Sequence, residues 1–123
     1  KIPLLALSID SESLERCEVG GLQDLSQDEL RRYIPDTRGF NSFSNTTAFR
    51  EYIAYEIKTS YELHEDMGIL GRTVTGKALD EPMSFSNFYA SRILRDEAMA
   101  TAAARWLRKY PEGRLVGLIG SDH

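Results

Sequence analysis

Two short apolar runs lie near the ends of the chain, and two longer amphipathic stretches lie between them. The short runs cover residues 2–9 and 115–119, and neither alternates with polar residues. A continuous apolar run of this length is typical of a strand that is buried on both faces of a parallel sheet. Pro3 fits such a strand near its start. We therefore predict one buried strand at each end of the chain.

The first amphipathic stretch predicts a long helix over residues 46–67. Its apolar positions follow one another in steps of four, four, four and three, and they are Phe49, Ile53, Ile57, Tyr61 and His64. This spacing places the five side chains on one face of a helix. Gly68 and Gly71 end the pattern.

The second stretch predicts a helix over residues 86–109, which is broken by Pro111 and Gly113. Its apolar face consists of Tyr89, Ile93, Ala100, Ala103 and Leu107. A glycine-containing loop up to residue 82 connects the two long helices. Because each stripe runs over several turns, the two helices can pack against each other as neighbours.

Two shorter helices are predicted from their capping residues. Asp10 and Ser11 offer N-caps for a helix through about Val19, and two glycines follow it. Ser26 and Glu29 form a capping box for a helix that must end before residue 35, a proline. Residues 36–44 are polar and contain a glycine, so we predict a loop there.

Two strands separated by more than a hundred residues do not form a stable sheet on their own. The pattern therefore predicts an α/β fold, in which this chain is a fragment of a parallel doubly wound sheet with a mostly helical inserted second domain. Residues 1–25 and 111–123 would belong to the α/β domain, and residues 26–110 would form the helical domain. Both ends of the chain have the character of cuts through a larger protein.

Composition narrows the range of partners. The 123 residues include 15 basic and 19 acidic side chains, for a net charge of -4, which argues against nucleic-acid binding. No apolar run approaches the length of about 18 residues that a transmembrane segment needs. A single cysteine, Cys17, excludes an internal disulfide framework, and we expect it to be buried on a short helix.

Residues 71–78 resemble a phosphate-binding loop but depart from the pattern at the last position. Ala78 stands where a hydroxyl should bind magnesium, and the segment follows a helix where the motif needs a strand. We interpret the segment as an ordinary interhelical loop.

Asp96 is a candidate functional residue because it interrupts the apolar stripe of the second long helix. Burying an unpaired carboxylate is costly, so Asp96 must be paired or have a shifted pKa. Arg92 lies one turn earlier and can pair with it. Either this pair holds the helix in register, or Asp96 orients a nearby site residue. His64 also has two interpretations, as a residue at the edge of the core or as a ligand.

The segment after the second predicted strand is the strongest candidate site. Residues 120–123 read Gly-Ser-Asp-His, and ligands of parallel sheets bind beyond the carboxyl ends of the strands. The imidazole of His123 can bind a metal ion or transfer a proton. An ordinary strand-end turn is the alternative. The six tyrosines lie mostly in or beside the long helices, where they usually form core, although a phenolate can also ligate ferric haem.

Three segments taken together resemble the ChaN-like haem-binding uptake family of the Tiki superfamily. They are residues 85–89, 95–100 and 115–123. The family carries an Asp-x-x-Met-Ala helix followed by an apolar strand that ends in Gly-x-x-His, as at residues 96–100 and 120–123. Residues 2–7 and the Gly-Leu segment at 21–25 are similar as well. The resemblance covers nearly the whole chain, and it is most specific in residues 95–123.

The resemblance implies a parallel α/β domain with a small helical domain, haem or iron handling, and homodimeric or pseudo-dimeric association. His123 matches the family histidine and Asp96 its helix acid, and we add Tyr89 and His64 as candidate cofactor-binding residues. A bacterial-envelope or plastid location would be consistent with the family.

Two alternatives follow from the wider superfamily and from the lack of a specific tyrosine motif. Related hydrolases combine the matching histidine with acids from a Gly-Glu-x-His segment, which has no counterpart in residues 1–123. The first alternative is therefore a metal-dependent hydrolase that uses His123, a divalent metal ion and acids outside this chain. The second alternative is a non-catalytic interaction domain.

Overall fold

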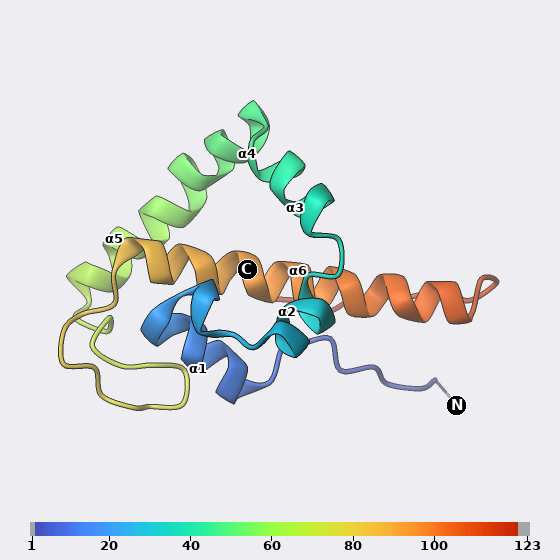
Figure 1. Cartoon of the computed structure of the whole chain (residues 1–123), viewed down its shortest axis with the longest axis horizontal. Coiled ribbons are helices and arrows are strands. Elements are labelled where there is room, and N and C mark those ends of the chain that lie inside the picture. Colours follow the sequence, from blue (N-terminus) through green and yellow to red (C-terminus); the bar gives the residue numbers. More distant parts are fainter. Residues whose placement is uncertain (1, 121–123) are drawn as a thin grey trace.

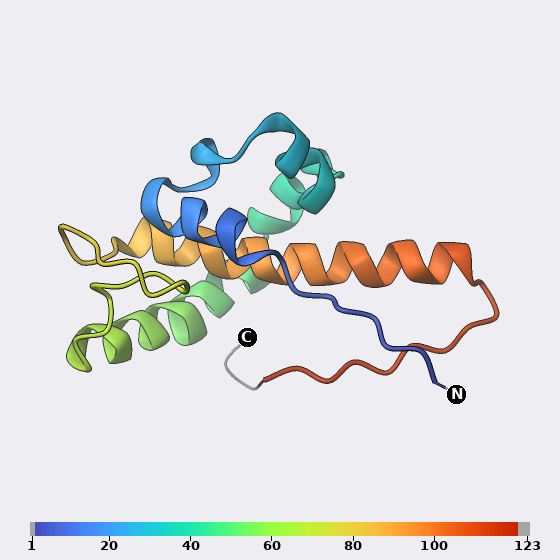
Figure 2. The ribbon, with the colours of Figure 1, turned by 90° about the horizontal axis from the view of Figure 1, so that it is seen from below.

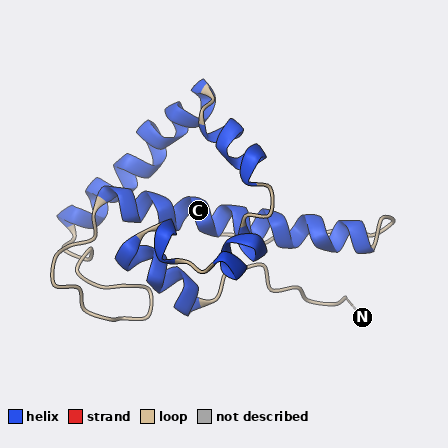
Figure 3. Ribbon diagram, viewed as in Figure 1, coloured by secondary structure: helices blue, strands red, loops and turns tan. Residues whose placement is uncertain are grey.

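Helices account for most of the chain in the computed structural model, which describes residues 2–120 (Figure 3). The elements are, in order, α1 (Ser11–Gly20), the 3-10 turn η1 (Leu22–Asp24), α2 (Gln27–Tyr33), α3 (Thr37–Ser44), α4 (Thr47–Tyr52), the π-helical turn η2 (Ile53–Ile57), α5 (Lys58–Asp66) and α6 (Phe85–Lys109).

Helix α6 is the element around which the others are arranged (Figures 1 and 2). It begins after Ser84, whose hydroxyl accepts a hydrogen bond from the Asn87 amide. Helix α1 makes the most extensive contact with α6. The side-chain amide of Asn87 ties the two together by donating to the carbonyl of Glu18 at 3.2 Å and that of Val19 at 2.9 Å.

Residues 37–66 form a helical arch over α6. In Figure 1, α3 leads away from α6, and α4, η2 and α5 form one continuous helix that leads back toward α6. Together with α6, these elements outline a triangle. Thr46 caps the start of this continuous helix at α4 by accepting a hydrogen bond from the Phe49 amide. The continuous helix confirms the one predicted over residues 46–67, except that its middle turn is π-helical.

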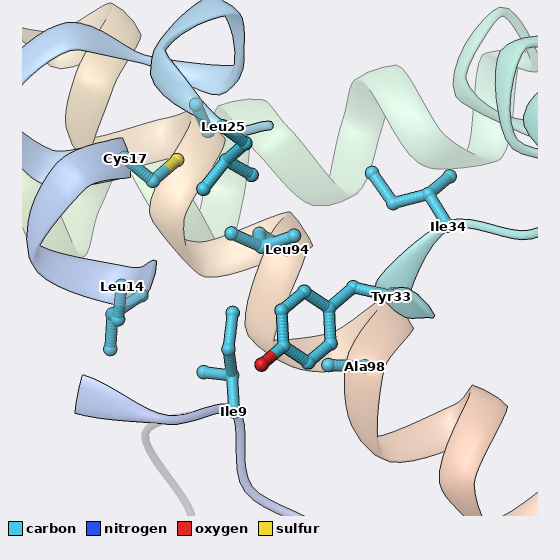
Figure 4. Packing of buried hydrophobic residues seen from close by; sticks show 9 residues of the cluster. Ile9, Leu14, Cys17, Leu25, Tyr33, Ile34, Leu94 and Ala98 are labelled. Atoms are coloured by element: carbon cyan, nitrogen blue, oxygen red, sulfur yellow. The ribbon is translucent and has the colours of Figure 1, made fainter. Parts of the chain in front are cut away.

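The buried side chains form two clusters, one on each side of α6. The first core lies against α1 and α2, is shown in Figure 4, and contains Ile9, Leu14, Cys17, Leu25, Tyr33, Ile34, Ala90, Leu94 and Ala98. The second core lies under the arch and contains Ile57, Leu70, Met83, Phe88 and Ile93. Leu94 and Cys17 are both 0% exposed, so the first core is the more completely closed of the two.

A network of polar side chains borders the first core where α1 begins. Asp10 caps α1 by accepting from the Ser13 amide at 2.9 Å, and its carboxylate also accepts from the hydroxyls of Ser13 and Tyr33. Glu29 accepts from Arg16, and one of its oxygens lies 2.6 Å from the Ser13 hydroxyl, which joins the capping box of α2 to α1. The predicted caps at Asp10 and Ser26 are therefore confirmed, and each has a role in packing as well.

The predicted α/β fold is wrong for the part of the chain that is described. Residues 2–9 and 114–120 are extended but pair with no strand, and the single bridge among residues 2–120 joins Arg72 to Ala78. Leu4 and Leu118 are 99% and 96% exposed. The physical reason is that an apolar run records a preference for burial, whereas a strand also needs a partner for its backbone hydrogen bonds.

The loop predicted over residues 36–44 is also wrong, because α3 occupies it. Asp36 accepts a hydrogen bond from the Gly39 amide at 2.9 Å and thereby caps the helix. Phe40 and Phe43 lie one turn apart on α3, and Phe40 packs against both cores. Packing of the Phe40 ring against both cores outweighs the low helix propensity of the polar residues around it.

Candidate functional site

An aromatic cavity of about 450 Å³ lies between α3, α4 and α6. Its lining residues are Asp36, Gly39, Phe40, Phe43, Ser44, Ala48, Phe49, Tyr52, Ile93, Asp96, Glu97 and Ala100. The rings of Phe43 and Phe49 have their centroids 5.2 Å apart, and those of Phe49 and Tyr52 lie 6.0 Å apart. We call this space the aromatic cavity, because these rings form its wall under the arch.

A second, more polar cavity of about 490 Å³ lies against the other part of the arch. It is lined by Tyr52, Tyr55, Glu56, Ile57, Thr59, Ser60, Leu63, His64, Arg92, Arg95 and Asp96. Tyr52 and Asp96 line both cavities, so the two spaces are neighbours. We call the second space the polar cavity.

His64 has a fixed environment at the polar cavity. Its Nδ1 lies 2.7 Å from the carbonyl oxygen of Ser60, one turn earlier on α5. A carbonyl can only accept, so Nδ1 is the donor in this contact, and Nε2 is the ring nitrogen left to face a ligand. The ring meets that of Phe88 edge-on at 5.2 Å, which anchors it to α6.

Arg92 contacts the same two residues as His64, which are Ser60 and Phe88. Its guanidinium donates to the Ser60 hydroxyl at 3.2 Å and lies 5.0 Å from the centre of the Phe88 ring. Ser60 and Phe88 therefore hold an imidazole and a guanidinium on the same cavity. The predicted pair of Arg92 with Asp96 is not tested by these contacts and stays a prediction.

Burial and neighbouring charges shift the pKa values of Tyr52 and Arg95 at the polar cavity. Burial raises the pKa of the Tyr52 phenol, and the carboxylates of Asp96 and Glu56 raise it further, with Arg92 acting in the opposite direction. Burial lowers the pKa of Arg95, as does the like charge of Arg92. The Tyr52 phenol therefore stays protonated at neutral pH.

The structure brings two of the four candidate cofactor-binding residues together. His64 and Asp96 both line the polar cavity. Tyr89 does not line it; its ring stacks on Phe85 at 6.2 Å in the second core, and burial raises the pKa of its phenol. His123, the predicted metal ligand and catalytic residue, lies outside the described residues.

Sequence reasoning missed the aromatic wall and the second arginine. Phe40 and Phe43 were placed in a predicted loop, although Asp36 as an N-cap and the three-residue spacing could have indicated a helix there. Arg95 faces the polar cavity because it follows Arg92 by three residues on α6. Ala100 was expected in a buried stripe, but it is exposed and lines the aromatic cavity.

Residues 71–78 form an interhelical loop, as predicted, and its polar side chains are engaged by α1. The Val74 amide donates to Glu18 at 2.8 Å, and Thr75 donates to Glu15. Lys77 lies 3.7 Å from Glu15. The lysine of the phosphate-loop-like pattern is thus paired with a carboxylate.

Cys17 is buried on α1, as expected, and burial raises the pKa of its thiol to about 12. Among the described residues, no group of three or more His, Cys, Asp or Glu side chains could hold a metal ion. None of the helices in residues 2–120 is long and apolar enough to cross a membrane.

Comparison with known proteins adds one finding to this geometry. The model of the family described as "Haem-binding uptake, Tiki superfamily, ChaN" matches residues 1–123. The chain belongs to this ChaN family. No curated protein and no solved structure matches it. Membership confirms the resemblance to this family, whose description names haem binding.

Proposed function

We propose that this chain binds haem in the polar cavity, with the imidazole of His64 as the iron ligand. The observation that carries the proposal is the His64 geometry. Metal-ligating histidines usually donate their second ring nitrogen to a carbonyl or carboxylate, which fixes the ring and directs the other nitrogen to the metal. The contact of Nδ1 with the Ser60 carbonyl supplies this second interaction.

The lining of the polar cavity fits the rest of the ligand. Its volume of about 490 Å³ falls within the range of small-molecule sites. Ile57 and Leu63 offer apolar contact for the macrocycle, and Tyr55 adds an aromatic ring. Arg92 and Arg95 line the same cavity, and their guanidiniums could pair with the haem carboxylates.

The neighbouring aromatic cavity is a poorer match for a dianionic ligand. None of its lining residues, all of which lie in the described part of the chain, carries a positive charge, and three of them are carboxylates. Bound haem would supply an iron centre that can exchange axial ligands. The chain's own residues would bind it, orient it through His64 and neutralise its carboxylates.

Haem titration followed by absorbance tests the proposal. We expect a saturable shift of the Soret band, and we expect His64→Ala to weaken binding by at least about tenfold, because second-sphere and ligand losses at metal sites are of this order. Arg95→Gln should weaken binding about threefold through one partly exposed charge. Tyr110→Phe, on the exposed end of α6, serves as the matched control.

Three outcomes would contradict the assignment. A titration without a saturable spectral change would remove haem as the ligand and favour the non-catalytic interaction domain. A normal Soret shift in His64→Ala that is lost in His123→Ala would move the iron ligand to the family histidine. Loss of esterase or peptidase turnover in His123→Ala, with a divalent metal bound, would instead support the metal-dependent hydrolase.

The proposal extends to a homodimer that covers the polar cavity. Tyr55 and Leu63 both line this cavity, yet they are 76% and 57% exposed. Apolar side chains at the mouth of a ligand site are suited to burial by a second copy. Sedimentation with and without haem tests this: Leu63→Ser should shift the chain toward monomer, and an unchanged monomer–dimer balance would contradict it.

A further inference from the structure

The aromatic cavity has a chemistry of its own that haem binding does not use. Its walls are the rings of Phe40, Phe43, Phe49 and Tyr52, and its floor on α6 includes Ile93 and Glu97. Phe43 is 62% exposed and lies at the mouth, whereas Phe49 is partly buried. A volume of about 450 Å³ is enough for a compact small molecule.

The charged residues at this cavity favour a ligand with a positive charge. Glu97 on α6 and Asp36 before α3 both line it. Burial raises the pKa of Glu97, and the like charge of Asp36 raises it further, so the two carboxylates lie close enough to repel each other. A cation between them would relieve this repulsion.

The aromatic wall favours the same sign independently. Ring faces carry negative potential and attract ammonium groups that lie within about 6 Å of the ring centre. The Phe43 and Phe49 rings are tilted against each other by 55°, and the Phe49 and Tyr52 rings by 36°, so the three rings of this wall do not stack in parallel. Aromatic boxes with an acidic rim are the arrangement that recognises organic ammonium ions.

We infer that the aromatic cavity binds a small organic cation, an aromatic or alkyl body that carries an ammonium group. The body lies against Phe40, Phe49 and Ile93, and the ammonium group lies between the rings and Glu97. The site is distinct from the proposed haem site, because haem carries two carboxylates that Asp36 and Glu97 would repel.

A matched series of three probes tests the inference by isothermal titration calorimetry. The probes are 4-phenylbutylamine, 4-phenylbutan-1-ol and 4-phenylbutyrate, which share one apolar body and differ in charge. We expect the amine to bind about fivefold more tightly than the alcohol, since a cation–π contact and an exposed ion pair each contribute a factor of a few. The carboxylate should bind most weakly.

Two variants and a control locate the site. Glu97→Gln should reduce the affinity of the amine about threefold and leave that of the alcohol unchanged. Phe49→Leu keeps an apolar side chain but removes a ring face, so it should narrow the preference for the amine over the alcohol. Glu65→Gln, an exposed carboxylate on α5 that lines neither cavity, should change nothing.

Equal affinity for the amine and the carboxylate would overturn the inference, as would the absence of binding by all three probes. Amide chemical-shift changes on amine binding should cluster in residues 36–52 and 93–100, and changes confined to other residues would also overturn it. Circular dichroism of each variant verifies that the helices are intact. The haem titration is independent, because His64→Ala affects that ligand and Glu97→Gln affects the amine.

Discussion

On one side of α6, α1 and α2 close around Leu94 and Cys17, both of which are 0% exposed. On the other side, the arch of residues 37–66 contains a single buried residue, Ile57, and borders two cavities. The same helix therefore supports a closed core and an open one. The closed side fixes the position of α6, and the open side has room for ligands. The closed core and the two proposed binding sites therefore lie on different faces of one helix.

The largest effect should come from truncating the closed core. Leu94→Ala should lower the free energy of unfolding by about 3 kcal/mol, because it leaves a cavity among fully buried neighbours. The same substitution at Leu63, which is 57% exposed on the arch, should change it by less than about 0.5 kcal/mol. Urea denaturation measures both. Similar losses at the two sites would show that the arch is as tightly packed as the first core.

A smaller and more local effect is expected at Ile57. Ile57→Ala should cost about 2 kcal/mol, at the low end for such truncations, because the adjacent cavities let the arch relax. Hydrogen exchange should show faster exchange in residues 47–66, while amides in residues 93–98 keep their protection. If both regions lost protection equally, the arch and the first core would be one cooperative unit.

The next prediction concerns acid and tests the polar network below the first core. Partial burial of Asp10 opposes ionisation, but hydrogen bonds from Tyr33 and Ser13 outweigh it and lower the pKa of Asp10 from 3.8 to about 2. A carboxylate with a lowered pKa stabilises the fold above its unfolded pKa, and the contribution is lost as the pH falls through 2. Exposure to solvent limits it to about 1 kcal/mol.

Asp10→Asn isolates this charge, since asparagine caps helices about as well as aspartate. The variant should be less stable than the parent by about 1 kcal/mol at pH 7, and the difference should disappear near pH 2. Thermal unfolding over this range measures it. If the stability difference did not vary with pH, Asp10 would stabilise the fold through the shape of its side chain and not through its charge.

The smallest effect is expected for the predicted pair of Arg92 and Asp96, which are both partly buried at the polar cavity. Their coupling energy in a double-mutant cycle of Arg92→Met and Asp96→Asn should be about 0.5–1 kcal/mol. Additive effects would show that each residue acts through other partners.

The sequence was informative where structure is local. Caps at Asp10 and Ser26 and the apolar stripes predicted the helices, because those signals lie within a few residues of the element they define. Pairing of residues 2–9 and 115–119 depends on neighbours distant in sequence, so an apolar pattern could not establish it.

The candidate site shows the same limit. The positions of His64 and Asp96 on two apolar stripes left each with a structural and a functional interpretation. Both side chains line the polar cavity, and their roles stay predictions. The aromatic cavity was not predicted, because residues 36–44 were interpreted as a loop and because the cavity depends on how α3 and α4 pack against α6. The sequence analysis also did not identify the face of α6 that contains Leu94 and Ala98. Asp96 and the alanines of this helix make its apolar periodicity hard to recognise.

The π-helical turn η2 makes the arch sensitive to the number of residues it contains. In an α-helix, each step of four overshoots a full turn by about 40°, so a long series of fours would drift off the face. The wider i→i+5 turn at residues 53–57 absorbs this drift and lets Phe49 and Tyr61 serve one side of the helix. If the same residues formed a regular α-helix instead, everything beyond the turn would rotate by about 100°. Tyr61 and His64 would then leave Phe88, so the extra residue that this one turn accommodates sets where the imidazole lies.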